Sequence, residues 1–270
     1  MAQQSVDSHI SDIAPFRMLG NVYFVGSSAV SVHIIDTGAG LIMIDSGYPR
    51  MHDQILYSMR SLGLDPANLR MIILTHGHYD HIGCVQEFKA LSGAKVCIGR
   101  PDNDIINGKR DLSWASELGY DRLPAFNADV LLDDSPIVEL GNTHIWFRLA
   151  PGHTEGTLAI FFDTEHEGKV YTCGMHGGAG VNSLVPSFLN KYGLPLTLPD
   201  TFRSGLKALA EIHVDAVLGN HPCQNDTTGK LSRVQAGEKD ACIDPEEWQR
   251  FLIECDRNLD EALKKDAAKN

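Results

Sequence analysis

The chain lacks the features that mark several large classes of protein. Its 270 residues contain no run approaching the roughly 20 apolar residues that a membrane-spanning helix needs. Positive charge is also scarce, because 23 Lys and Arg stand against 35 Asp and Glu, for a formal net charge of −12. Such a protein repels phosphate backbones and anionic lipid surfaces. We therefore expect a soluble protein with neither nucleic acid nor a membrane as its partner.

Paired cysteines and a secretory leader are missing too. The six cysteines form no Cys-x-x-Cys pair, which argues against a thiolate zinc site and a dithiol redox site and predicts reduced, mostly buried thiols. The first 15 residues show no basic segment followed by an apolar one, so they do not resemble a secretory signal. This favours the cytoplasm, whereas the periplasm is expected if a leader has been removed.

Short apolar runs that suit strands alternate with helical patterns along the whole chain. The predicted strands are 21–25, 32–36, 41–45, 71–74, 95–98, 130–132, 137–140, 143–149, 158–162, 170–172 and 216–218. The predicted helices are 50–62, 81–91, 101–107, 111–118, 201–211 and a C-terminal helix capped by Asp244 with Pro245 as its first residue. These patterns predict an α/β protein with sheets covered by helices on one face and packed together on the other.

No linker or repeat divides the chain. We expect an N-terminal extension at residues 1–14 and a single domain at residues 15–270. The polar insertion at about residues 100–128 is the best candidate for a surface flap, and it or the segment 184–199 could serve as a lid or an interface. The oligomeric state stays open.

The most informative segment is Leu74–Cys84, which contains the pattern His-x-His-x-Asp-His between a predicted strand and a predicted helix. Side chains two apart in a loop can point to the same side, so His76 and His78 can bind one metal ion. Asp80 and His81 can turn towards a second ion. Neutral imidazole and carboxylate oxygen suit zinc. A polar loop with incidental histidines would account for a single histidine, but it does not account for the whole pattern.

Two later loops each present a histidine directly after a predicted strand. His153 lies within Pro-Gly-His-Thr-Glu-Gly, and His221 lies within Leu-Gly-Asn-His-Pro. Pro and Gly shape tight turns at both places. Either residue alone could be an ordinary turn histidine, but three strand ends with histidines favour convergence on one site.

With these motifs the chain resembles the metallo-β-lactamase superfamily, and most closely the third subclass of class B β-lactamases, from about residue 15 to residue 222. The resemblance implies a four-layer αβ/βα sandwich with the site at one edge of two sheets. It also implies two zinc ions, the first held by His76, His78 and His153 and the second by Asp80, His81 and His221.

The resemblance further implies a dinuclear zinc hydrolase that uses a metal-bridging hydroxide to open a cyclic amide or related acyl bond, as in β-lactam hydrolysis. Asp80 would then be the catalytic residue, because it can both ligate and orient the nucleophile. Asp45 is similar to the family's buried aspartate that braces the ligand loop, although an Asx-turn after a strand explains it equally. The substrate is expected to be a small molecule, and the zinc charge could attract an anionic one.

Residues 173–180, Cys-Gly-Met-His-Gly-Gly-Ala-Gly, depart from the subclass pattern. They lack the hydroxyls of its serine-rich loop and the aspartate that bridges two metals in other members. His176 could line the substrate pocket, donate a proton or bind metal, or it could be an exposed loop histidine. Cys173 is expected to pack under the site. Cys242 lacks the disulfide partner that exported members commonly have.

These departures favour an alternative function. The chain could be a cytoplasmic hydrolase of lactones, thioesters or other metabolites without significant β-lactamase activity. A metal-dependent binding or scaffold domain is the non-enzymatic alternative. A diiron redox protein is disfavoured, because it would need the bridging carboxylate and a flavin module that the sequence lacks.

Overall fold

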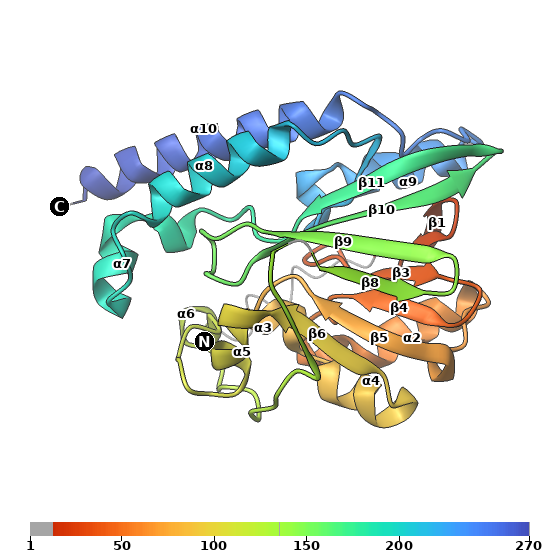
Figure 1. Ribbon diagram of the computed structural model, residues 1–270, viewed down its shortest axis with the longest axis horizontal. Coiled ribbons are helices and arrows are strands. Elements are labelled where there is room, and N and C mark those ends of the chain that lie inside the picture. The colour runs from red at the N-terminus through yellow and green to blue at the C-terminus, as the bar shows by residue number, and fades with distance from the viewer. Residues whose placement is uncertain (1–12, 135, 270) are drawn as a thin grey trace.

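The computed structural model describes residues 13–134 and 136–269 (Figure 1). Most of the predicted N-terminal extension, residues 1–12, lies outside the described residues. Ile13, at the end of that extension, is buried in the core. Within the described ranges no helix combines the length and the apolar character needed to cross a membrane.

Two sheets form the centre of the molecule. The first contains β1 (Phe16–Leu19), β2 (Val22–Phe24), β3 (His33–Asp36), β4 (Leu41–Ile44), β5 (Leu69–Leu74), β6 (Lys95–Gly99) and β7 (Val130–Leu132), in that order. The second contains β8 (Ile137–Leu140), β9 (Thr143–Leu149), β10 (Leu158–His166), β11 (Lys169–His176) and β12 (Ala216–Val217), in the order β12-β11-β10-β9-β8. Strands β1 to β4 form an antiparallel meander, and β4 to β7 run parallel.

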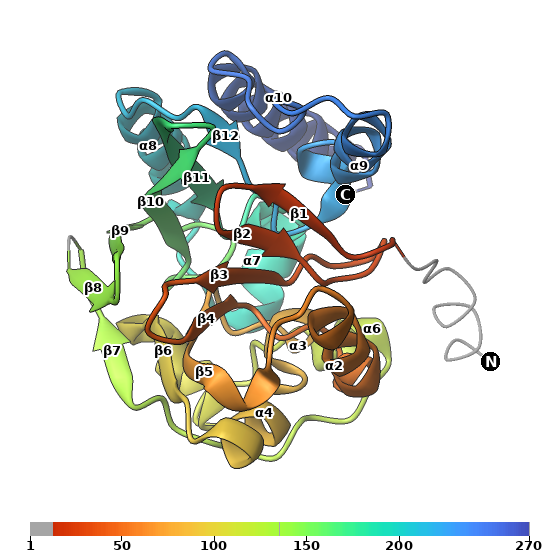
Figure 2. The same ribbon diagram turned by 90° about the vertical axis from the view of Figure 1, so that its right-hand side faces the viewer.

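Helices cover the outer face of each sheet. The longer ones are α2 (His52–Ser61), α4 (Val85–Ser92), α8 (Leu198–Ala210) and α10 (Glu247–Ala267). Helix α9 (Thr227–Gln235) instead packs against β1, and its Leu231 joins the core between the sheets. Figure 2 shows α2 and α4 on the outer side of the first sheet, and α8 and α10 on the outer side of the second. The short helices are α3 (Tyr79–Ile82), α5 (Asn103–Ile106), α6 (Ala115–Leu118) and α7 (Pro186–Tyr192). The predicted four-layer αβ/βα sandwich is therefore confirmed.

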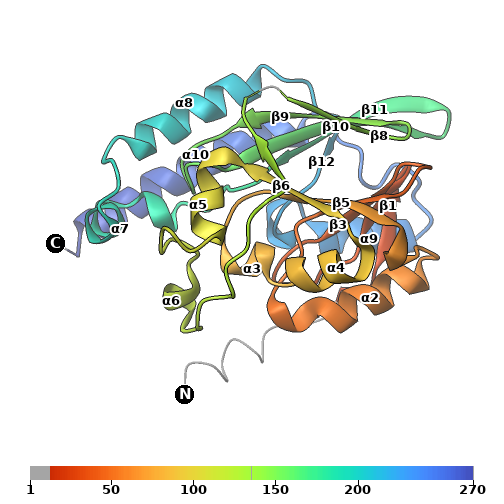
Figure 3. The same cartoon turned by 60° about the horizontal axis from the view of Figure 1, so that its bottom comes forward.

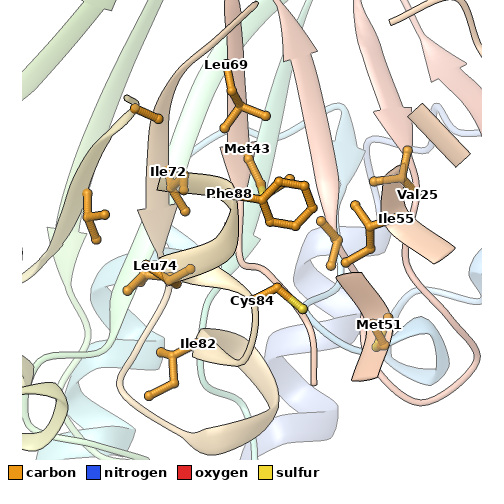
Figure 4. Close-up of a cluster of buried hydrophobic side chains, with 14 of the residues drawn as sticks. Val25, Met43, Met51, Ile55, Leu69, Ile72, Leu74, Ile82, Cys84 and Phe88 are labelled. Atoms are coloured by element: carbon orange, nitrogen blue, oxygen red, sulfur yellow. The ribbon is translucent and has the colours of Figure 1, made fainter. Parts of the chain in front are cut away.

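Three apolar cores separate the four layers. Between the first sheet and its helices, Met43 and Ile72 pack against Ile55 and Phe88 (Figure 4). Successive side chains of β10 point to opposite faces of the second sheet, so they enter the other two cores in turn. Phe162 faces the core between the sheets, and Phe161 faces the core under α8 and α10.

Several predicted boundaries were wrong, each for a tertiary reason. The helix predicted at 81–91 is two helices, α3 and α4, because the Gly83 amide donates to the carbonyl oxygen of Gly47 at 2.8 Å and Cys84 leaves the helical region with φ −109° and ψ 13°. Strand β11 continues to His176, because it pairs with β10 along its whole length. The last helix begins at Glu247, and Asp244 accepts a hydrogen bond from the Glu246 amide instead of capping. Strand β1 and helices α7 and α9 were not predicted.

Phe161 gives a direct test of the core under α10. Its ring stacks on Trp146 with 4.2 Å between centroids and meets Trp248 edge-on at 5.9 Å. Phe161→Leu should lower the free energy of unfolding by about 1–3 kcal/mol, since each aromatic pair contributes about 0.5–1.5 kcal/mol beyond buried area. Urea denaturation measures the change. Tyr57→Leu, at a side chain that is 72% exposed, is the control; equal effects of the two substitutions would contradict this account.

Candidate metal centre

All six predicted ligands lie at one end of the two sheets. His76 and His78 follow β5, Asp80 and His81 lie in α3, His153 lies between β9 and β10, and His221 follows β12. In Figure 3 the short helices α3, α5, α6 and α7 gather towards this end. The side chains form two groups, within each of which the potential ligand atoms lie within 4.8 Å of one another. These groups are His76, His78 and His153, and Asp80, His81 and His221.

The first group is a tight cluster of imidazoles. The ring centroids of His76, His78 and His153 lie 4.4–4.7 Å apart. Burial and the neighbouring histidines hold the pKa values of His76 and His78 well below the ordinary range. Burial likewise lowers the pKa of His153 to about 4. The three rings are therefore neutral at pH 7, which is the form that binds metal.

The second group adjoins the first. Oδ2 of Asp80 lies 3.4 Å from Nε2 of His81 and 3.7 Å from Nε2 of His221. The His81 ring lies 4.2 Å from the His76 ring, so the two groups share a border. Although burial opposes it, His81 and His221 lower the pKa of Asp80, which stays ionised. The Asp80 side chain is 13% exposed and that of His221 is 31% exposed, so this part of the site opens to solvent.

Hydrogen bonds on the far side orient the imidazole rings. Nδ1 of His153 donates to the carbonyl oxygen of Gly180, and Nδ1 of His221 donates to that of Ala29, both at 2.7 Å. Nδ1 of His81 lies 2.7 Å from Oδ2 of Asp45. Nδ1 of His76 bonds the Thr75 hydroxyl at 3.0 Å. Such partners select the tautomer and leave the other nitrogen for a ligand.

A metal ion fits this arrangement. The Nε2 atoms of His76 and His81 are buried and have no hydrogen-bond partner. A buried polar atom without a hydrogen-bond partner destabilises the folded protein by about 1–3 kcal/mol. Metal ions bound to the two nitrogen atoms would remove this penalty. The set of imidazole nitrogens with one carboxylate suits zinc.

Asp45 connects to both groups. Its carboxylate accepts hydrogen bonds from the amide and the hydroxyl of Thr75, both at 2.8 Å, and it pairs with His81. It therefore contacts one ligand directly and reaches His76 through Thr75. Its backbone φ of 59° lies in the left-handed region, which aspartate and asparagine tolerate better than most residues.

His176 and Cys173 lie in β11. His176 ends the strand, is 1% exposed and packs 5.6 Å from the Phe202 ring, so an exposed loop histidine was the wrong alternative. Burial lowers its pKa to about 4. Cys173 is buried between the sheets, where burial raises the pKa of its thiol. All six cysteines are unpaired thiols, and Cys223 is the exposed one among them.

Sequence reasoning missed the residues that surround the site from other segments. Trp114, in the predicted flap, lies 5.5 Å from the His78 ring and stacks on Phe188 of α7 at 4.8 Å. Glu117 pairs with Lys191 at 2.5 Å, which also joins the flap to α7. A lone tryptophan in a polar insertion is a signal that could have pointed to this contact.

Comparison with known proteins gives the family. A family model described as the metallo-beta-lactamase superfamily matches residues 25–196. The chain belongs to this superfamily. The predicted family and the predicted enzyme class, a metal-dependent hydrolase, are confirmed at this level.

The curated relatives are distant. The chain is 27% identical over 168 residues to a probable metallo-hydrolase, YflN, of Bacillus subtilis, covering 58% of this chain and 60% of the relative. It is 30% identical over 117 residues to the hydroxyacylglutathione hydrolase GloC of Haemophilus influenzae, covering 42% of this chain and 53% of the relative. The matches thus span little more than half of these relatives.

Solved structures match over nearly the whole chain. The subclass B3 metallo-beta-lactamase BJP-1 of Bradyrhizobium japonicum aligns with a TM-score of 0.87 and 23% identity over 98% of this chain and 99% of that one. The metallo-beta-lactamase FEZ-1 of Legionella gormanii aligns with a TM-score of 0.86 and 26% identity over 96% and 98%. This chain therefore adopts the fold of these two metallo-beta-lactamases over nearly its whole length.

Proposed function

We propose that this protein is a dinuclear zinc hydrolase that opens a cyclic amide or a related acyl bond of a small molecule. The observation that carries the proposal is the pair of adjoining ligand groups, in which four of the five imidazole rings are hydrogen-bonded through Nδ1. The Nε2 atoms of His76 and His81 are buried without a hydrogen-bond partner. His76, His78 and His153 would hold one ion, and Asp80, His81 and His221 would hold the other.

When bound, a pair of zinc ions lowers the pKa of a coordinated water and polarises a carbonyl group. The chain's own residues supply position and charge. Asp80 stays ionised and partly accessible, so its carboxylate can accept a hydrogen bond from the attacking water and orient it. Asp45 holds the His81 ring in one orientation. His176, buried beside Phe202, is proposed to line the substrate pocket.

Two substrate classes compete. Likeness to class B3 metallo-beta-lactamases over nearly the whole chain supports β-lactams. Likeness to a hydroxyacylglutathione hydrolase, together with the absence of hydroxyls in residues 173–180, supports lactones or thioesters. The test compares turnover of a chromogenic cephalosporin with turnover of lactone and thioester panels, each against free zinc. Cephalosporin turnover no faster than with free zinc would exclude the β-lactamase function.

Metal content is the first prediction to check. Protein purified without chelators should contain about two zinc ions per chain. Removing them should abolish hydrolysis and lower Tm, because a ligand that binds only the folded state stabilises it. Elemental analysis, hydrolysis assays and thermal melts before and after zinc is returned measure this. Protein without bound zinc that still hydrolyses its substrate would contradict the proposal.

A further inference from the structure

Asp102, which follows β6 and was not predicted as a site residue, is fully buried and connects two ligand loops. Its Oδ2 accepts hydrogen bonds from the Gly77 amide at 2.8 Å and from the Thr154 hydroxyl at 2.7 Å. Its Oδ1 accepts one from the Gly156 amide at 2.7 Å. Gly77 stands between His76 and His78, and Thr154 follows His153. One carboxylate therefore holds together the two loops that carry the first ligand group.

The surrounding backbone is built for this connection. A Cβ on Gly156 would lie 2.6 Å from the backbone nitrogen and Oδ1 of Asp102. A Cβ on Gly99 would lie 2.0 Å from the carbonyl oxygen of Gly156. Glycine at both positions thus lets the His153 loop approach β6 and Asp102 closely enough to form these bonds.

Asp102 and Asp45 act on different parts of the site. Asp45 contacts His81 of the second group and reaches the first group only at His76, through Thr75. The three hydrogen-bond donors to Asp102 all lie in loops of the first group. The contrast predicts that loss of Asp102 would disturb one group and spare the other.

We propose that Asp102 is a positioning residue that sets the zinc affinity of the His76, His78 and His153 group by fixing their two loops relative to each other. The inference rests on the proposed metal centre. Without the carboxylate, zinc binding would have to order the loops itself and would lose affinity by the free energy of that ordering. Outer partners of metal ligands typically contribute 10- to 100-fold in affinity.

Asp102→Asn is the primary variant. The asparagine side chain replaces one carboxylate oxygen with an NH2 group, which is a donor. In one orientation this group faces the Gly156 amide, and in the other it faces the Gly77 amide and the Thr154 hydroxyl, so at least one hydrogen bond is lost. Thr154→Val removes the hydroxyl that donates to Asp102, together with its 2.8 Å contact with the Thr157 hydroxyl, and Thr154→Ser keeps both. Asp133→Asn, at a nearby side chain that is 58% exposed and pairs with Arg100, is the matched control.

Removing one ligand from either group allows the zinc affinity of the other group to be measured by itself. Zinc affinity is measured by chelator competition in the His221→Ala background, which leaves the first group complete, and in the His153→Ala background, which leaves the second complete. In the first background Asp102→Asn and Thr154→Val should weaken affinity by about 10- to 100-fold and at least about threefold, respectively. Thr154→Ser and Asp133→Asn should match their parent. In the His153→Ala background all should stay within about twofold.

The outcomes separate the two proposals. If the parent protein binds no zinc, the proposed function fails and the inference fails with it. If the parent binds two ions but Asp102→Asn weakens both groups equally, or neither, then only the inference fails. Apo-protein melts show whether Asp102→Asn folds, and if it does not, the comparison of Thr154→Val with Thr154→Ser decides.

Discussion

Asp80→Asn should lower turnover by about 100- to 10,000-fold, the range that a positioned acid or base contributes. The Asp80 carboxylate lies between His81 and His221 and stays ionised beside them. Asparagine keeps its shape but removes the negative charge, so it accepts a hydrogen bond from the attacking water less well. It also weakens the second ligand group, because an amide oxygen is a poorer ligand than a carboxylate.

The measurement has to separate these two effects. Turnover is measured with zinc raised until elemental analysis shows two ions per chain, so that the remaining loss reports the orienting role. Asp53→Asn, whose side chain is 99% exposed, controls for loss of a negative charge elsewhere. Full activity of Asp80→Asn with zinc bound would show that Asp80 has no catalytic role even if the ligand assignment is right.

Asp45→Asn should weaken zinc binding by about 10- to 100-fold at each group, since outer partners of metal ligands contribute that much. Its carboxylate pairs with His81 and reaches His76 through Thr75. An amide nitrogen facing the His81 ring or Thr75 would place two donors together. Asparagine is the informative replacement, because it tolerates the left-handed backbone at this position and alanine would add strain.

Thr75→Val is the companion variant for Asp45→Asn. It removes the hydroxyl that links Asp45 to His76 but leaves the bond between Asp45 and His81 in place. We expect it to weaken the first group and to spare the second. Chelator competition in the His153→Ala and His221→Ala backgrounds measures both groups. If Asp45→Asn binds both ions as tightly as the parent, Asp45 is a turn residue only.

Most of the architecture was predictable from local patterns. The strand and helix alternation follows from apolar spacing, which is a property of neighbouring residues. The exceptions are helices and strands whose ends are set by contacts with segments distant in sequence. Helix α3 ends where the Gly83 amide donates to the distant carbonyl of Gly47, and β11 reaches His176 because β10 pairs with it that far. Helix α7 is short, and one face of it is covered by Trp114 from a segment about 70 residues away.

The site divides along the same line. The pattern His-x-His-x-Asp-His and the strand-end positions of His153 and His221 can be predicted from the sequence, because ligand type and loop placement depend on nearby residues. The orientation of each ring depends on atoms remote in sequence. Asp45 precedes Thr75 by 30 positions, Asp102 precedes Thr154 by 52, and Ala29 lies 192 positions before His221.

No spacing rule encodes such pairs, since they form only when two sheets, their helices and the flap have packed. The amino-acid sequence therefore sufficed to identify the family and to predict the six candidate metal ligands, which the fold brings together in two groups. The tertiary structure alone showed that Asp45 reaches both ligand groups whereas Asp102 bonds only loops of the first, and it buried His176 against Phe202. The physical reason is that metal ligands are chosen by their chemistry, whereas their positioning residues are chosen by proximity after folding.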